Sequence, residues 1–286
     1  MSLNNFIPTI WSARLLSALQ KSLVYGQAGV VNRDYEGEIR AKGDSVKITA
    51  IGDVTVKEYT KNTDIDSPEE LQDASQWLQI TEEKYFNFQV DDIDKVQIAG
   101  PVVDEAMTRA AYKLRDALDA FVAGHYVHVP SANLVGNDGA PIAGLAANAA
   151  YTKLVDLAVK LDEANVPTEG RFVVIPPFLH GALLKDDRFV KSGTEGGESR
   201  LVNGQVGEAA GFRVLKSNNV PNDSGTKYKV VAGTSMGFSL AEQITSVEAF
   251  RMEKRFADGV KGLHVYGGKL VRPYCWAVGT VNNAAT

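Results

Sequence analysis

The sequence predicts an α+β protein in which a long hairpin and a long helix precede a distinct compact layer. Apolar and polar residues alternate with a period of two in residues 43–91 and again in residues 247–278, as in strands with one buried face. Between these regions, residues 101–124 carry an apolar stripe at helical spacing. A helix–strand–helix order in residues 149–184 indicates a compact α/β layer.

The first 42 residues begin with a short extended piece and continue as an amphipathic helix. Apolar residues recur near helical spacing from Ile10 to Leu23, and Gly26 is suited to end the helix. No apolar partner for this stripe is obvious nearby in the sequence. Two interpretations therefore stay open: the helix docks on the core of its own chain, or it lies as an arm across a neighbouring subunit.

Residues 43–91 are interpreted as a long hairpin. Its two expected strands, at 46–50 and 86–90, both alternate, and they enclose a polar stretch, residues 52–75, with few large apolar side chains. Such a stretch buries too little apolar surface to fold alone. We therefore expect it to be mobile in a free subunit and to become ordered on another subunit.

The clearest helix follows Gly100-Pro101 and ends near Gly124. Asp104 and Glu105 lie in its first turn, where negative charge is favourable against the helix dipole. Its apolar stripe is expected to pack on the carboxy-terminal strands. The stripe consists of Val103, Met107, Ala110, Leu114, Ala117, Leu118 and Phe121.

The second half of the chain predicts short elements followed by long strands. A helix is expected at 149–164, a buried strand at 171–175 and a further helix at 178–184. The last forty residues, 247–286, alternate in both halves around glycines, which predicts antiparallel strands with a glycine-containing turn or bulge.

Charge and composition exclude several classes of protein. The formal net charge is -5, from 35 acidic and 30 basic side chains, and no basic run is present. A protein that condenses nucleic acid through its own charge normally carries such a run. The single cysteine, Cys275, excludes an intrachain disulfide. No secretory signal and no apolar run long enough to span a bilayer are present, so no membrane partner is expected.

No segment concentrates the side chains of an active site. The aspartates within 91–94 lack the pattern of a calcium-binding loop, and His125 and His128 have no Cys or Glu at ligand spacing. The glycines of 193–197 lack the Lys-Ser/Thr of a phosphate-binding loop, and Ser235 is not interpreted as a nucleophile. We therefore expect no enzyme activity, no metal and no cofactor.

Several phrases resemble the major capsid proteins of tailed bacteriophages, in the correct order along nearly the whole chain. They are Phe6-Ile7-Pro8-Thr9-Ile10-Trp11-Ser12-Ala13-Arg14-Leu15-Leu16, Asn32-Arg33-Asp34-Tyr35-Glu36-Gly37, the stretch 167–189, Gly207-Glu208-Ala209-Ala210-Gly211-Phe212-Arg213-Val214, and Gly262-Leu263-His264-Val265-Tyr266-Gly267. No single phrase is decisive, but ordered blocks are hard to obtain by chance.

This resemblance implies the Hong-Kong-97-type capsid fold, in which the helix of 101–124 is the spine helix of a peripheral domain. It divides the chain into an N-terminal arm (1–42), an extended hairpin loop (43–91), a peripheral domain with the spine helix (92–148), an α/β axial domain (149–243) and return strands of the peripheral domain (244–286).

The resemblance also implies a function in assembly. The subunit would associate with itself into pentamers and hexamers, which close as an icosahedral head shell around packaged double-stranded DNA without sequence-specific binding. A separately encoded scaffolding protein is expected, because the resemblance begins at Phe6 and leaves no room for a long cleavable segment ahead of it. A portal is a further partner that the resemblance implies, and whether a decoration protein also binds stays open on the sequence. Assembly in the host cytoplasm would place the protein in the virion capsid.

Two rival functions stay open on the sequence alone. An encapsulin-like compartment uses the same fold to enclose a protein cargo, and a cytosolic hydrolase could bring dispersed residues together in space. The candidate contacts between subunits are the large or charged side chains of the arm and the hairpin. These are Phe6, Trp11, Tyr59, Lys61 and Trp77.

Overall fold

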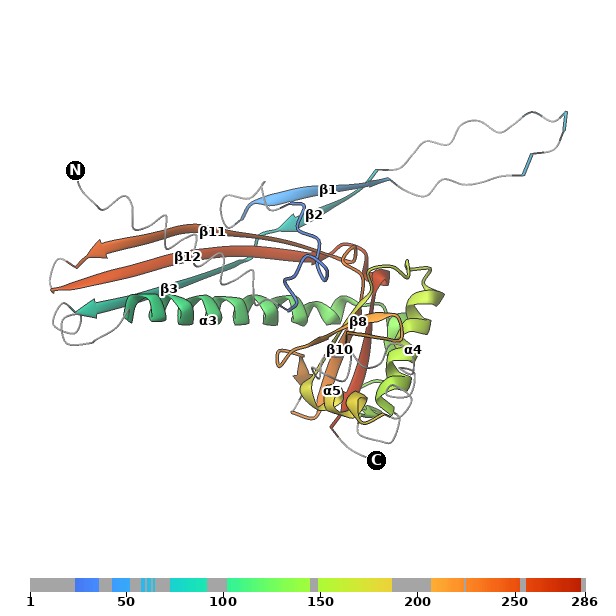
Figure 1. Cartoon of the computed structure of the whole chain (residues 1–286). Coiled ribbons are helices and arrows are strands. Elements are labelled where there is room, and N and C mark those ends of the chain that lie inside the picture. Colours follow the sequence, from blue (N-terminus) through green and yellow to red (C-terminus); the bar gives the residue numbers. More distant parts are fainter. Residues whose placement is uncertain are drawn as a thin grey trace.

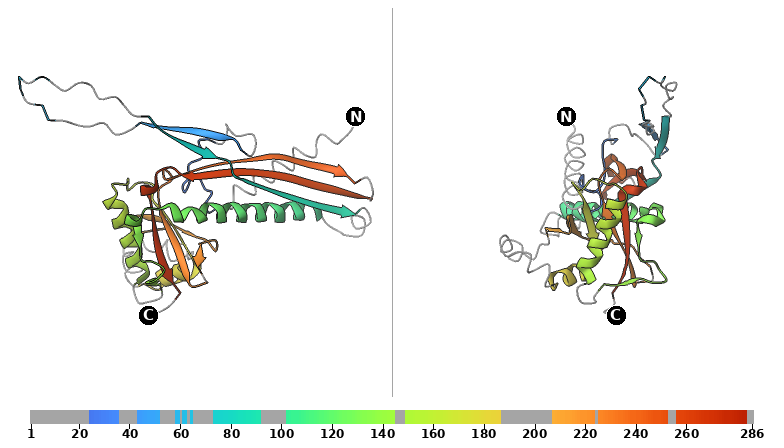
Figure 2. Two further views of the ribbon diagram at one scale, coloured as in Figure 1. Left: turned by 180° about the vertical axis from the view of Figure 1, so that it is seen from behind. Right: turned by 90° about the vertical axis from the view of Figure 1, so that its right-hand side faces the viewer.

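A computed structural model describes most of the chain in separate stretches. These are residues 24–35, 43–51, 58, 59, 61, 62, 64, 73–91, 102–144, 149–186, 207–223, 225–252 and 256–283. Within them, an elongated part and a compact part meet at one end, and a two-stranded ribbon projects from the junction, as Figures 1 and 2 show. This arrangement is mixed α+β, as the sequence predicts.

The elongated part is a three-stranded antiparallel sheet with the long helix on one face (Figure 1). Its strands, in the order β11-β12-β3, are β11 (Phe238–Arg251), β12 (Ala257–Leu270) and β3 (Glu82–Asp91). The register between β11 and β12 shifts between Ile244 and Ser246, which is a β-bulge. The predicted antiparallel pairing of the carboxy-terminal strands is confirmed. The predicted glycine-containing turn or bulge is wrong, because the bulge lies between Ile244 and Ser246 and the glycines of residues 259–268 lie within β12.

The long helix α3 (Val102–Gly124) lies along this sheet and buries the predicted side. Met107, Ala111 and Leu114 pack against Val247 and Val260 of the two long strands. Toward the junction the same stripe continues with Leu118 and Val122, both fully buried in the main core. The sequence-based packing of this helix on the carboxy-terminal strands is confirmed.

The predicted hairpin is wrong in its pairing. Strand β1 (Ser45–Ile51) pairs with β2 (Asp73–Gln79), whereas β3 pairs with β12 in the other sheet. Periodicity did not identify the true return strand because β2 begins within the polar stretch and, of its described side chains, only Leu78 is buried. Most of residues 52–72 lie outside the described stretches, so the predicted mobility of this excursion is not addressed.

The compact part is an eight-stranded mixed sheet flanked by two helices (Figures 1 and 2). The helices are α4 (Ala149–Glu163) and α5 (Pro177–Leu184), on either side of β6 (Phe172–Ile175) in the sequence, which confirms the predicted helix–strand–helix order. The other strands are β4 (Leu134–Val135), β5 (Ile142–Ala143), β7 (Glu208–Ala209), β8 (Phe212–Lys216), β9 (Asn222–Asp223), β10 (Lys227–Gly233) and β13 (Trp276–Asn282).

Three strands that the sequence assigned to the peripheral domain belong to the compact sheet instead. The last strand, β13, is paired with β10 in the compact sheet, although residues 244–286 were expected to return to the peripheral domain. Strands β4 and β5 also join this sheet through β13, although residues 92–148 were expected to be peripheral. The cause is pairing distant in the sequence, which local alternation does not specify. The domain boundaries themselves stay a prediction.

A continuous core joins the two parts. Trp276, fully buried at the start of β13, stacks on Phe238 at the start of β11 with ring centroids 5.4 Å apart, and its indole N–H donates to the carbonyl of Thr234 at 3.3 Å. A Cβ at Gly237 would lie 2.6 Å from the indole ring, so glycine at this position makes room for the tryptophan.

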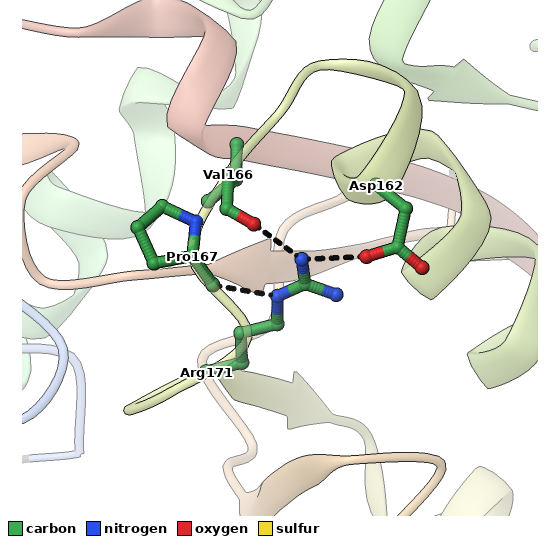
Figure 3. Close-up of polar contacts among 4 residues, drawn as sticks. All are labelled: Asp162, Val166, Pro167 and Arg171. Atoms are coloured by element: carbon green, nitrogen blue, oxygen red, sulfur yellow. Dashed lines mark hydrogen bonds and ion pairs between the residues drawn. The ribbon is translucent and has the colours of Figure 1, made fainter.

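A buried arginine fixes the connection between α4 and β6 (Figure 3). The Arg171 guanidinium donates to the carbonyls of Val166 at 2.6 Å and Pro167 at 2.9 Å, and it forms an ion pair with Asp162 at 2.7 Å. These bonds satisfy two carbonyl groups of the loop that follows α4 and tie that loop to the start of β6. Within the described stretches, no helix is long and apolar enough to cross a membrane.

Candidate inter-subunit surfaces

Among the described elements, only the ribbon of β1 and β2 lies on the face of the long sheet opposite α3, and it lies near the junction. There the ribbon of β1 and β2 packs Val46, Ile48, Leu78 and Ile80 against Val265 of β12. Further from the junction, no element of the described stretches lies on this face. We call this uncovered half the outer sheet face.

The outer sheet face carries an aromatic side chain and a charged pair around a shallow hollow. Tyr85 of β3 is 77% exposed, and Lys261 of β12 pairs with Glu248 of β11 at 2.9 Å. The ammonium of the same lysine lies 5.6 Å from the centroid of the Phe250 ring. The hollow has a volume of about 300 Å³ and is lined by Tyr85, Phe86, Asn87, Glu248, Lys261, Gly262 and Leu263.

The candidate contact residues of the ribbon are exposed. Trp77 of β2 is 52% exposed and lies opposite Lys47 in the register, and Tyr59 is 70% exposed. Lys61 is also exposed, in a turn between the two ribbon strands. Trp77 is exposed next to the fully buried Leu78 because successive side chains of a strand point to opposite faces.

Phe6 and Trp11 lie outside the described residues. The candidate contacts of the arm therefore stay predictions, and so does the amphipathic helix that precedes Gly26.

Sequence reasoning missed Tyr85 and Phe256, which are 77% and 81% exposed. The signal for Tyr85 was present, because alternation in β3 that packs the partly buried Phe86 and Phe88 against α3 must turn Tyr85 to the opposite face. The signal for Phe256 was absent, since it lies just before β12 at the end of the sheet away from the junction, where local periodicity stops.

The described histidine and cysteine side chains that could act in catalysis or metal binding make structural contacts instead. The Nδ1–H of His125 donates to the carbonyl of Phe121 at 2.9 Å, and burial lowers the pKa of this histidine. Burial also raises the pKa of the Cys275 thiol. In the described stretches no three His, Cys, Asp or Glu side chains gather as a metal-binding group.

Ser235 lies between two strands. The segment Gly233-Thr234-Ser235-Met236-Gly237 has the glycine spacing of a nucleophile elbow, but it joins β10 to β11, whereas an elbow joins a strand to a helix. The described geometry therefore supports contact surfaces more strongly than a catalytic centre.

Known proteins match this chain over most of its length. The sequence matches the family described as phage capsid protein over residues 76–279. A solved structure from Mycobacterium phage Che8 is 32% identical, with 90% of this chain and 91% of that chain covered and a TM-score of 0.70. No curated protein sequence matches the chain.

More distant structures share the fold. The capsid of Ralstonia phage GP4 is 12% identical, with 93% and 90% of the two chains covered and a TM-score of 0.69. A virus-like particle from Pyrococcus furiosus is 13% identical, with 95% and 98% covered and a TM-score of 0.54. The family match and the 32% identical structure agree with the architecture built above. The chain belongs to the phage capsid protein family, as a major capsid protein of the Hong-Kong-97-type fold that forms the phage head shell.

Proposed function

We propose that this structural protein assembles into pentamers and hexamers through its ribbon, which lies on the outer sheet face of a neighbouring copy. One observation carries the proposal. One end of the ribbon of β1 and β2 lies at the junction and points away from the long sheet, while no described element covers the half of that sheet's face away from the junction (Figures 1 and 2). Each copy therefore offers both halves of a head-to-tail contact, and a head-to-tail contact that closes produces a ring.

The side chains on both surfaces suit such a contact. The ribbon presents Trp77 and Tyr59, and the outer sheet face presents Tyr85 beside the pair of Lys261 and Glu248. Large aromatic side chains dominate the binding energy of protein interfaces, and charged pairs at the rim fix register more than affinity. Contacts that are individually modest become strong when each subunit makes several of them.

The enclosed DNA is proposed to be confined rather than bound by sequence. The net charge of -5 disfavours condensation of DNA by the coat itself. A packaging motor would then drive the genome into a preformed shell. The family resemblance, rather than the geometry, supports a scaffolding protein, a portal, a decoration protein, assembly in the host cytoplasm and the absence of enzyme activity.

Shortening the ribbon tests the central contact. Replacing residues 52–72 by a short turn should leave a folded subunit that no longer forms shells in negative-stain images, because this stretch has few large apolar side chains to contribute to a core. Tyr85→Ser should reduce the yield of shells, and Tyr112→Ser is the matched control, since Tyr112 is 52% exposed but lies on α3. Normal shells from the shortened ribbon would disprove the contact.

The content of the shells separates phage capsid from cellular compartment. The fold alone does not distinguish them, as the similarity to the Pyrococcus furiosus virus-like particle illustrates. Shells purified from infected cells should contain double-stranded DNA. A stoichiometric protein cargo in their place would favour the encapsulin-like alternative.

A further inference from the structure

Residues 24–33 form a short plug at the junction between the elongated and compact parts. Tyr25, Val30 and Val31 are fully buried in the core that also contains Phe238 and Trp276. The plug continues directly from the first 23 residues, so whatever holds the plug also holds the base of the amino-terminal segment.

Strand β11 holds one side of the plug. The backbone N–H of Asn32 donates to the carbonyl of Phe238 at 2.8 Å, and its carbonyl accepts from the N–H of Leu240 at 2.8 Å. The Arg33 guanidinium pairs with Glu242 of the same strand at 2.6 Å, and its Nε donates to the carbonyl of Gly26 at 2.9 Å. This side is therefore fastened by backbone bonds and a nearly buried ion pair.

The long helix α3 holds the other side through one carboxylate. Asp119 is only 3% exposed, and its Oδ2 accepts from the backbone N–H of Val24 at 3.2 Å. The backbone amides of Tyr25 and Gly26 also act on this carboxylate. Its other oxygen, Oδ1, is buried without a hydrogen-bond partner among the described residues. A buried carboxylate with one oxygen unsatisfied is costly when it is ionised.

We propose that Asp119 makes the docking of residues 24–33 on α3 a pH-sensitive joint, which holds the base of the amino-terminal segment more tightly as the medium becomes acidic. The joint goes beyond assembly itself, because it concerns how firmly one segment is attached to its own subunit. Nothing in it depends on the ribbon contact proposed above.

The direction follows from burial. Burial raises the pKa of Asp119 to about 6, and the three backbone N–H groups and the nearby Arg115 only partly oppose this rise. When the plug leaves α3, the carboxylate meets water and returns to its ordinary pKa of 3.8. A carboxyl whose pKa is raised in the docked state favours docking at low pH, and this contribution is lost as the pH rises through about 6.

Within the described stretches, the ionisable side chains that interact electrostatically with the Asp119 carboxylate are Tyr25 of the plug and Arg115 of α3. Tyr25 is the titratable group of the plug beside Asp119, and burial raises the pKa of that phenol first, with the Asp119 charge adding to the rise. Arg115 of α3 stays charged throughout the range. The other charged or titratable side chains around the plug are Arg33, Glu242, His264 and Arg213.

Hydrogen exchange of the full-length subunit tests the joint. We would measure protection factors, corrected for intrinsic exchange, in peptides that cover residues 24–33 at pH 5, 6 and 7. The two pKa values predict that protection falls about ten-fold from pH 5 to pH 7 in the wild type. In Asp119→Asn, which cannot ionise, protection should be flat over the same range.

Two controls separate the joint from general destabilisation. Asp116→Asn, one turn earlier on α3, removes a carboxylate that accepts from Asn219 at 2.8 Å and should keep the wild-type slope. Peptides of β6 should keep constant protection. Flat wild-type protection of residues 24–33 overturns the proposal even if Asp119→Asn fails to fold. An equal slope in Asp119→Asn, or an equal fall in β6, also overturns it.

Discussion

Truncating leucines along α3 should reveal two different environments on one helix. Leu118 is fully buried in the large core shared by both parts, whereas Leu114 is 6% exposed and belongs to a smaller cluster between α3 and the long sheet. Leu-to-Ala changes in cores cost about 2–5 kcal/mol, and the cost is larger where the surroundings cannot collapse into the cavity. We therefore expect about 4–5 kcal/mol for Leu118→Ala and about 2–3 kcal/mol for Leu114→Ala.

Urea unfolding of the unassembled subunit, followed by far-UV circular dichroism, measures these losses. With a slope of about 1–3 kcal/mol per molar urea, each kcal/mol displaces the midpoint by roughly 0.3–1 M. Lys113→Ala is the control, because this exposed neighbour should change the free energy of unfolding by less than about 0.5 kcal/mol. Equal midpoints for Leu114→Ala and Lys113→Ala, or a smaller loss for Leu118→Ala than for Leu114→Ala, would refute the reasoning.

Three further changes test other contacts by the same unfolding assay. Gly262→Ala should cost about 1–3 kcal/mol because its Cβ would overlap an aromatic ring of β3, whereas Gly124→Ala, with open space around it, should cost nothing. Arg171→Ala should cost about 2–4 kcal/mol by leaving buried carbonyls unpaired, and Arg251→Ala, which breaks an exposed pair, should cost less than about 1 kcal/mol. Glu242→Gln should reduce the fall in the free energy of unfolding as the pH is lowered. If this fall is the same as in the wild type, Glu242 does not contribute to the pH dependence of stability.

The sign of the Glu242 effect follows from its partners. Burial alone would raise the pKa of this carboxyl, but the hydrogen bond from His264 and the charge of Arg33 outweigh burial and hold the pKa below its ordinary value. A carboxyl with a lowered pKa in the folded state contributes stability above its ordinary pKa of 4.5, and that stability is lost as the pH falls through the lowered value.

Local periodicity predicted the helices well, because a helix is determined largely by its own residues. The stripe of α3 identified the buried face, and α4 ends within one residue of the expected position. Strand pairing was predicted less well. The alternation of 86–90 fits any sheet with one buried face, so the sequence did not distinguish β1 from β12 as its partner.

The candidate surfaces also include residues that the local sequence indicates and residues that depend on contacts distant in the sequence. Trp77, a candidate contact from the sequence, is exposed, although its role as a contact stays a prediction, and the exposure of Tyr85 could have been predicted from alternation. Asp119 could not, because its partner Val24 is 95 positions away and nothing near either residue in the sequence marks the contact. Asp119 lies on the buried side of α3 beside Leu118, and only the contact with residues 24–33 explains why a carboxylate occupies this position.

The stacking of Trp276 on Phe238 has a geometric consequence for the shell. The angle between the elongated and compact parts is set by interlocked side chains rather than by a flexible linker, and close-packed interiors resist gradual deformation. A closed surface built from copies of one unit takes its curvature from that unit's internal angles. We therefore expect the curvature of the shell to depend partly on the packing of Trp276, so trimming this side chain should broaden the distribution of particle diameters in electron micrographs.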